Sequence, residues 1–261
     1  MAEKLGLVLL CNGVDKVTAA TRHNLMLGAT QIKMAVSGGV ISFTDPLYVN
    51  EFYEEEIHAA VRAAEDFGTY VMVHCHSSSA AQRALKAGVK SFDHMSCADE
   101  ETIKMLADAG AVASVQLLVA AHVADTYPKG DPRQVKGALA VANARNALSY
   151  AKKHGLTLGW GTDLIDNAEA RDQQLKDLTM RLDYDFTSAE LMIQATGNGG
   201  KTVALSGKRN PYGKVGMIEA GAMADILIYS KNPLENIKII EDFDTNLKLV
   251  IKDGDIVKNT L

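Results

Sequence analysis

The sequence of 261 residues predicts an α/β fold with a parallel sheet. Helix-like stretches, with apolar residues three and four positions apart, alternate with short apolar runs. A glycine follows most of the helix-like stretches, as is usual where a helix ends. The short runs are apolar almost throughout, which is typical of strands buried on both faces. These observations favour five strand–helix units before residue 166.

Each unit pairs a helix-like stretch with the strand-like run that follows it. The expected helices are Asp15–Leu27, Glu51–Phe67, Ser79–Ala87, Asp99–Ala109 and Gln134–His154. The expected strands are Gln31–Val36, Tyr70–His74, Val89–His94, Val112–Gln116 and Leu156–Asp163. Strands that alternate with helices in this way predict parallel βαβ units and not an antiparallel sheet.

The C-terminal part has a different pattern. Residues 166–206 are expected to be helical, and residues 213–221 are punctuated by glycine. The runs Ala224–Tyr229 and Leu247–Val257 read as strands, the second bent by a hairpin turn at Asp253-Gly254. We therefore expect two domains, an α/β domain over 1–206 and a small β-rich subdomain over 207–261.

Composition excludes several classes of protein. The net charge of −5 and the pI near 5.8 argue against a nucleic-acid partner, which would need clustered Lys and Arg. No apolar run approaches the roughly 18 residues that a membrane span requires. The three cysteines are an odd number without a disulfide framework, so a reducing cytoplasm is the expected location.

Polar and titratable residues collect where the predicted strands end. They are Lys33, His74 with His76, His94, Gln116 and Asp163. Because functional residues of parallel βα folds lie at the C-terminal ends of strands, these side chains would meet at one mouth if the strands curve into a barrel. Imidazole and carboxylate bind divalent metals, and a metal there would activate water at neutral pH.

Structural roles compete with this interpretation. A single histidine at a strand end is more often a hydrogen-bonded structural residue than a ligand, and Cys75 reads as a packed thiol. Lys33 is different because it lies inside an apolar strand, where an unpaired buried ammonium is costly. Its amine must therefore be paired, neutral or chemically modified.

An ordered set of motifs resembles the amidohydrolase superfamily, in particular its prolidase and imidazolonepropionase-like branch. The motifs are Gly28–Lys33 with Ser37–Val40, Val73–His76, Ala87–His94, Gly161–Asp163, Ala195–Asn198, Gly216–Ile226, Asn232–Leu234 and Val250–Gly254. Each is weak alone, but their order matches that branch from about residue 12 to the end of the chain.

The resemblance implies a role for each residue. Lys33 would carry a CO2-derived carbamate that bridges two metals, with one or two zinc ions expected. His74 and His94 would bind the more exposed metal, while Asp163 would bind the other metal and act as the general base. His76 would contact the substrate.

One part of the family pattern has no counterpart before Lys33: the His-x-His pair of the first barrel strand. The resemblance therefore implies strands four to eight of a (β/α)8 TIM-type barrel, with a small C-terminal segment derived from a β-sandwich. We favour an incomplete version of a longer gene, with Met1 inside the reading frame. The alternatives are a short protein whose missing strands come from another chain, and a non-catalytic remnant.

The function expected from the resemblance is metal-dependent hydrolysis of a C–N bond by a metal-activated hydroxide. Dipeptide-like or N-acyl amino acid substrates are favoured. A cyclic-amide hydrolase of the imidazolonepropionase type is a second possibility, and a catalytically silent interaction domain is a third. A homo-oligomer is also expected, since an open sheet edge invites pairing.

Overall fold

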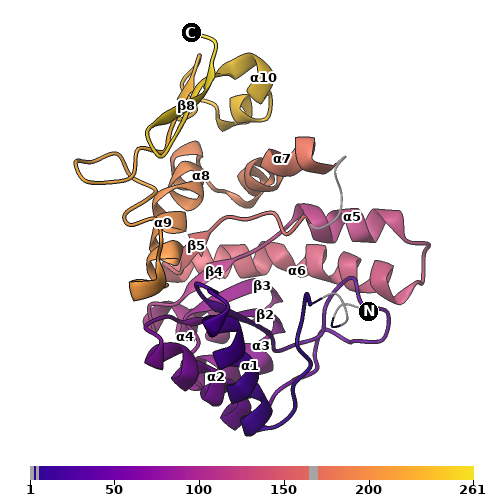
Figure 1. Cartoon of the computed structure of the whole chain (residues 1–261). Coiled ribbons are helices and arrows are strands. Elements are labelled where there is room, and N and C mark those ends of the chain that lie inside the picture. Colours follow the sequence, from indigo (N-terminus) through magenta and orange to yellow (C-terminus); the bar gives the residue numbers. More distant parts are fainter. Residues whose placement is uncertain (1–2, 4–5, 165–169) are drawn as a thin grey trace.

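A five-stranded parallel sheet forms the centre of the molecule (Figure 1). The computed structural model describes residue 3, residues 6–164 and residues 170–261. The strands are β1 (Ile32–Ala35), β2 (Val71–Ser77), β3 (Ser91–Cys97), β4 (Val112–Ser114) and β5 (Thr157–Gly159), and they lie side by side in chain order. This order confirms the predicted α/β fold with parallel strands.

Of the helices that precede β5, five contribute to the same core as this sheet. They are α1 (Val14–Met26), α2 (Glu54–Asp66), α3 (Ser78–Lys86), α4 (Glu100–Asp108) and α6 (Pro132–His154). Their termini are specified locally. Asp131 caps α6 through a bond to the backbone N–H of Arg133, and Gly155 ends α6 in the left-handed conformation.

The two faces of the sheet differ in burial. Ile32 and Met34 of β1 are buried in the core, whereas Lys33 and Ala35 between them are exposed. The same alternation begins in β2, where His74 is half-buried between buried neighbours. The prediction that the strands are buried on both faces is therefore wrong for β1 and the start of β2. In this part of the sheet, the face with Ile32 packs in the core with the helices, and the face with Lys33 reaches solvent.

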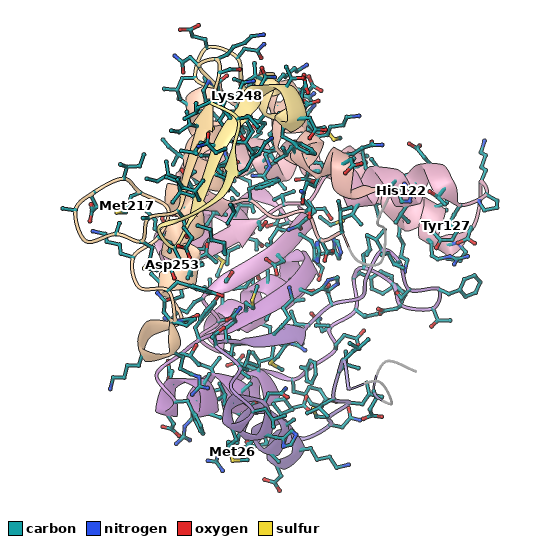
Figure 2. The ribbon with its side chains drawn as sticks, turned by 45° about the horizontal axis from the view of Figure 1, so that its top comes forward. Met26, His122, Tyr127, Met217, Lys248 and Asp253 are labelled. Atoms are coloured by element: carbon teal, nitrogen blue, oxygen red, sulfur yellow. The ribbon has the colours of Figure 1, made fainter. Side chains whose placement is uncertain are left out.

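Two of the described α-helices were not predicted from the sequence: one is the four-residue helix Phe243–Asn246, and the other follows the fourth strand. Helix α5 (Leu118–Thr126) follows the fourth strand and has no side-chain N-cap, so only an apolar run announces it. It packs on α6 at Gly137, where an added Cβ would lie 2.8 Å from the backbone nitrogen of Ala124. Figure 2 shows His122 and Tyr127 at the outer end of this helix pair.

The remaining elements follow the fifth strand. They are a 3-10 helix at Ala170–Gln173, α7 (Gln174–Thr179), 3-10 turns at Met180–Tyr184, Gly207–Arg209 and Ile237–Ile240, α8 (Ser188–Ala195), α9 (Gly197–Ala204), α10 (Phe243–Asn246), and strands β6 (Ile226–Tyr229), β7 (Leu247–Lys252) and β8 (Asp255–Asn259). These three strands form an antiparallel sheet, and the predicted hairpin turn is confirmed by positive φ at Asp253 and Gly254. None of the described helices has the length and hydropathy of a membrane span.

Candidate metal centre

Three imidazoles meet at the carboxyl ends of β2 and β3. His74, His76 and His94 can each offer one ligand atom, with these atoms all within 4.8 Å of one another. The ring centroids of His74 and His94 are 4.4 Å apart, and those of His76 and His94 are 4.8 Å apart. We call these three residues the histidine cluster.

His74 and His76 reach the cluster by ordinary strand geometry. They are two residues apart on β2, so their side chains leave the same face of the sheet. Cys75 between them faces the core, where it is fully buried. The cysteine is thus a packed thiol, and burial raises its pKa to about 12.

His94 reaches the cluster by an unusual backbone conformation. In the β2–β3 register it is paired with Cys75, whose side chain points into the core. A regular strand would direct His94 to that same side. Instead φ is +73° at His94 and +52° at Met95, in the left-handed region that costs non-glycine residues free energy. This turn carries the imidazole over to His74.

Two hydrogen bonds orient the rings on β2. Nε2 of His74 lies 3.1 Å from the Gly38 carbonyl oxygen, which can only accept a hydrogen bond. Nε2 must therefore be protonated, which leaves the lone pair of Nδ1 free to bind a metal. Nδ1 of His76 lies 2.7 Å from the Ser96 hydroxyl, so its Nε2 is the atom left for the cluster.

The electrostatics keep the cluster uncharged. Burial lowers the pKa of His74, and the charge of Lys33 lowers it further, against the opposing bond to Gly38. Burial lowers the pKa of His76 to about 3 and that of His94 well below its usual value. All three imidazoles are therefore neutral at pH 7, which is the form that binds metals.

Lys33 stands beside the cluster but is not buried. Its side chain is 45% exposed, and its amino group forms an ion pair with the Asp93 carboxylate. The expectation of an ammonium buried in an apolar strand is wrong, because β1 is the first strand of the sheet and its Lys33 face is open. Asp93, which sequence analysis did not single out, supplies the charge partner.

Asp163 approaches the cluster from the loop after β5. Its Oδ2 lies 3.9 Å from Nε2 of His94, and its φ is +54°. Burial raises the pKa of this carboxyl, while the charge of Lys33 opposes the rise. Gln116, also predicted at a strand end, donates to the Ser114 hydroxyl at 2.9 Å. The structure thus brings Lys33 and Asp163 to the edge of the histidine cluster.

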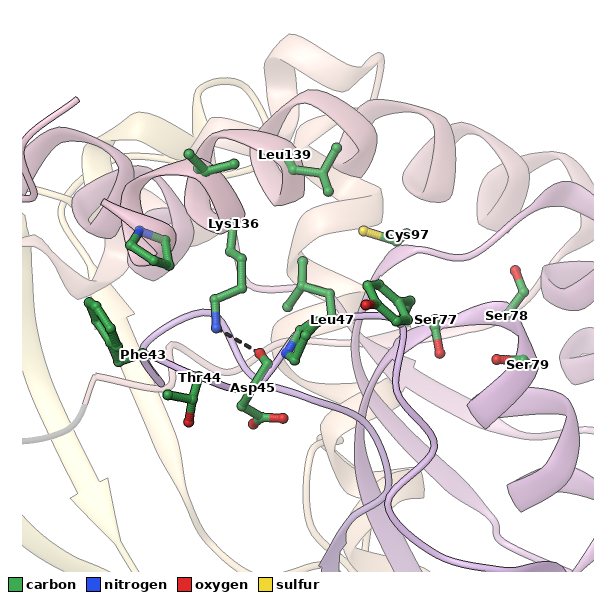
Figure 3. Close-up of a pocket in the computed structure, with 14 residues that line it drawn as sticks. Phe43, Thr44, Asp45, Leu47, Ser77, Ser78, Ser79, Cys97, Lys136 and Leu139 are labelled. Atoms are coloured by element: carbon green, nitrogen blue, oxygen red, sulfur yellow. Dashed lines mark hydrogen bonds between the residues drawn. The ribbon is translucent and has the colours of Figure 1, made fainter. Parts of the chain in front are cut away.

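A pocket of about 670 Å³ lies between the loop after β1 and helix α6 (Figure 3). Phe43, Leu47 and Leu139 give it an apolar wall, and Lys136 extends toward the loop. Sequence analysis missed Lys136, because a lysine in a long helix usually lies on its solvated face. Its position on α6, within the packed α5–α6 pair, is what distinguishes Lys136 from a lysine on the solvated face of a helix.

Comparison with known sequences identifies related proteins. The sequence profile described as the amidohydrolase family matches residues 2–257. Ochratoxinase of Aspergillus niger is 30% identical over 241 residues, which are 91% of this chain and 48% of that protein. The chain thus spans about half the length of the curated relatives it matches.

Solved structures give the same picture. A prolidase crystallised with N-methylphosphonate-L-proline has a TM-score of 0.87 and 31% identity, over 97% of this chain and 61% of that chain. A Xaa-Pro dipeptidase with methionine in its active site has a TM-score of 0.83 and 28% identity, over 95% of this chain and 59% of that chain. The five-stranded sheet thus corresponds to part of a larger α/β fold.

Proposed function

The chain belongs to the amidohydrolase family, and from that premise we propose that it is a metal-dependent hydrolase of C–N bonds in amide or peptide-like substrates. One observation carries the proposal: three neutral imidazoles and a carboxylate converge at the carboxyl ends of parallel strands. Such a set of side chains combines ligands for a metal, a carboxylate that can accept a proton, and a position that a substrate can reach from solvent.

The histidine cluster fits a divalent metal. Its ligand atoms all lie within 4.8 Å of one another, its rings are desolvated and neutral, and hydrogen bonds to Gly38 and Ser96 leave one nitrogen on each of His74 and His76 free. We therefore propose His74, His76 and His94 as the metal ligands, in place of a substrate contact for His76. When bound, a divalent ion polarises a carbonyl group and lowers the pKa of water.

Asp163 is proposed as the general base. Its Oδ2 lies 3.9 Å from Nε2 of His94, and its raised pKa makes it a better proton acceptor than an ordinary aspartate. It would take a proton from water at Oδ2 and deliver it to the leaving nitrogen. Its partial exposure leaves space for the substrate on its solvent side.

Lys33 and the identity of the metal belong to the same proposal. We propose zinc as the metal, since imidazole and carboxylate are common zinc ligands. We also propose a carbamate on Lys33, which the motif resemblance supports. As an ammonium, Lys33 pairs with the Asp93 carboxylate. Carboxylation by CO2 removes a proton and turns the amine into an anion, so a bound cation is needed to offset its repulsion from Asp93. Intact-mass measurement with and without zinc and bicarbonate tests the modification.

The substrate class is proposed from the relatives. A prolidase and a Xaa-Pro dipeptidase align over nearly the whole chain, which supports dipeptide-like or N-acyl amino acid substrates. The three free cysteines support a reducing compartment such as the cytoplasm. Strands β1 and β5 lie at the two edges of the five-stranded sheet, and edge strands of this kind support pairing with a further segment or a second copy of the chain.

The test is hydrolysis of Xaa-Pro dipeptides and N-acyl amino acids by the chain with added Zn²⁺. We expect cleavage that a chelator abolishes, zinc restores, and the Lys33→Ala variant lacks. The exposed Lys90→Ala variant is the control. Zinc binding without cleavage of any of these amides would contradict the hydrolase and favour a binding domain.

A further inference from the structure

The segment between β1 and α2 lacks regular structure where it passes the histidine cluster. Residues 37–50 contain neither helix nor strand. Of the described backbone groups in this range, only one pair forms a backbone–backbone bond, from Val49 to Pro46. We call residues 37–47 the collar. Because its backbone does not fix its own shape, other groups must do so.

Lys136 supplies the main ties. Its side chain comes from α6, and the residue is only 9% exposed. Its Nζ donates to the carbonyl oxygens of Gly39 at 2.6 Å, Ser42 at 2.6 Å and Asp45 at 2.7 Å, and it lies 3.1 Å from the Ser42 hydroxyl. Figure 3 shows the bond to Asp45. Three carbonyl oxygens thus accept hydrogen bonds from the three N–H groups of one buried ammonium.

Contacts inside the collar tighten it further. The Asp45 carboxylate accepts from the backbone of Gly39 at 3.0 Å and from the Ser42 hydroxyl at 3.1 Å. At Gly38 a Cβ would lie 2.1 Å from the carbonyl oxygen of Pro46. The two ends of the collar therefore approach each other closely, and only glycine fits at Gly38.

The N-terminal end of the collar contacts the histidine cluster. The Gly38 carbonyl accepts from Nε2 of His74, and a Cβ on Gly39 would lie 3.4 Å from Cε1 of the same ring. The Ser37 hydroxyl accepts from the backbone nitrogen of His76 at 2.9 Å. The collar therefore holds one ring directly and the backbone of its neighbour.

We propose that Lys136 is a positioning residue for the metal centre: through the collar it holds the Gly38 carbonyl against His74 and so keeps Nδ1 as the metal-binding nitrogen. The inference rests on the proposed function, because it takes His74 to be a ligand. A side chain on α6 thus orients a ligand on β2, although the two elements are far apart in the sequence. Groups that orient metal-binding histidines typically contribute about 10- to 100-fold to metal affinity.

The test compares three variants of the chain by Co²⁺ titration, read from the visible absorption of the bound ion. Lys136→Met removes the ties at nearly constant side-chain length. Leu148→Ala removes a fully buried side chain from the same helix, and Lys153→Met removes an exposed lysine from it. We expect Lys136→Met to weaken Co²⁺ binding about 10-fold or more, while both controls bind as the wild-type chain does.

A second readout needs no metal. In the ¹⁵N NMR spectrum of the metal-free chain, His74 should be protonated at Nε2, and Lys136→Met should give a mixture of tautomers. Asp45→Ala, on a partly exposed loop position, removes a smaller part of the collar and should shift both readouts in the same direction. It keeps the inference testable if Lys136→Met does not fold.

The outcomes separate the two proposals. The role of Lys136 alone is overturned if the wild-type chain binds Co²⁺ and Lys136→Met shows unchanged affinity and an unchanged His74 tautomer. If Lys136→Met does not fold, the same result for Asp45→Ala overturns it. Equal weakening by Leu148→Ala also overturns it, since lower stability would then explain the loss. A wild-type chain that binds no Co²⁺ overturns the proposed function and, with it, this inference.

Discussion

The rings of His74 and His94 lie 4.4 Å apart between centroids, although the β2–β3 register places His94 opposite Cys75 and not opposite His74. The left-handed backbone at His94 accounts for the difference. A strained conformation of this kind persists only where surrounding contacts fix it. Here Phe92 before it and Met95 after it are both fully buried and anchor the turn.

Asp163→Asn tests the assignment of the general base. The amide keeps the size of the carboxylate but cannot accept a proton, so we expect kcat for dipeptide hydrolysis to fall by about 10²- to 10⁴-fold. Because the three imidazoles remain, Co²⁺ affinity should change far less than kcat. A variant with wild-type kcat would exclude Asp163 as the base.

The buried histidines predict a loss of stability in mild acid. Burial lowers the pKa of His76 to about 3, so below pH 6.5 the unfolded chain binds a proton there that the folded chain does not. Stability is therefore fully present above pH 6.5 and decreases as the pH falls toward 3. The slope from this residue is about 1.4 kcal/mol per pH unit.

Urea unfolding of the metal-free chain at several pH values between 7 and 5 measures this slope. The comparison with His76→Gln isolates the contribution of one residue, because all other titrating groups are shared. We expect the variant to have the shallower dependence on pH. Identical slopes would mean that His76 is not buried in its neutral form.

Arg181 predicts a large effect on stability far from the histidine cluster. It is fully buried, and its guanidinium donates to the carbonyl oxygens of Gly159 at 3.1 Å and Val115 at 2.6 Å, behind β5 and β4. The buried Asp177 carboxylate interacts electrostatically with the Arg181 guanidinium and accepts a hydrogen bond from the backbone N–H of Leu117. These contacts join the end of β5 to the segment that follows β4.

Arg181→Leu removes these hydrogen bonds and leaves Asp177 without the nearby positive charge. We expect the free energy of unfolding to fall by roughly 3–5 kcal/mol, measured by urea denaturation. Arg62→Leu, at an exposed position on α2, is the matched control and should change stability by less than about 0.5 kcal/mol. A similarly small change for Arg181→Leu would show that this buried network is not stabilising.

The sequence predicts the sheet and most of the candidate site because both depend on local patterns. Helix spacing, terminal glycines and apolar runs set the order of the elements, and strand ends set the approximate place of His74 and His94. Strand limits are less predictable. The strand expected over Leu156–Asp163 ends at Gly159, so Asp163 reaches the cluster from a loop.

The parts that could not be predicted depend on contacts between distant residues. Nothing in the sequence indicates that His94 adopts a left-handed conformation or that Asp93 pairs with Lys33. The bond from Lys136 to Gly39 joins positions 97 residues apart. An irregular loop has no periodicity from which its neighbours could be read, so the collar becomes visible only in three dimensions.

The histidine cluster as a metal site is tested most directly by X-ray absorption of the chain loaded with one equivalent of Zn²⁺, together with its His74→Ala/His76→Ala/His94→Ala variant. We expect imidazole scattering from three nitrogen ligands at about 2.0–2.1 Å in the wild-type chain. The triple variant should retain no zinc after dialysis, whereas exposed His23→Ala should retain it fully. Undiminished zinc in the triple variant, or a spectrum without imidazole scattering, would contradict the site.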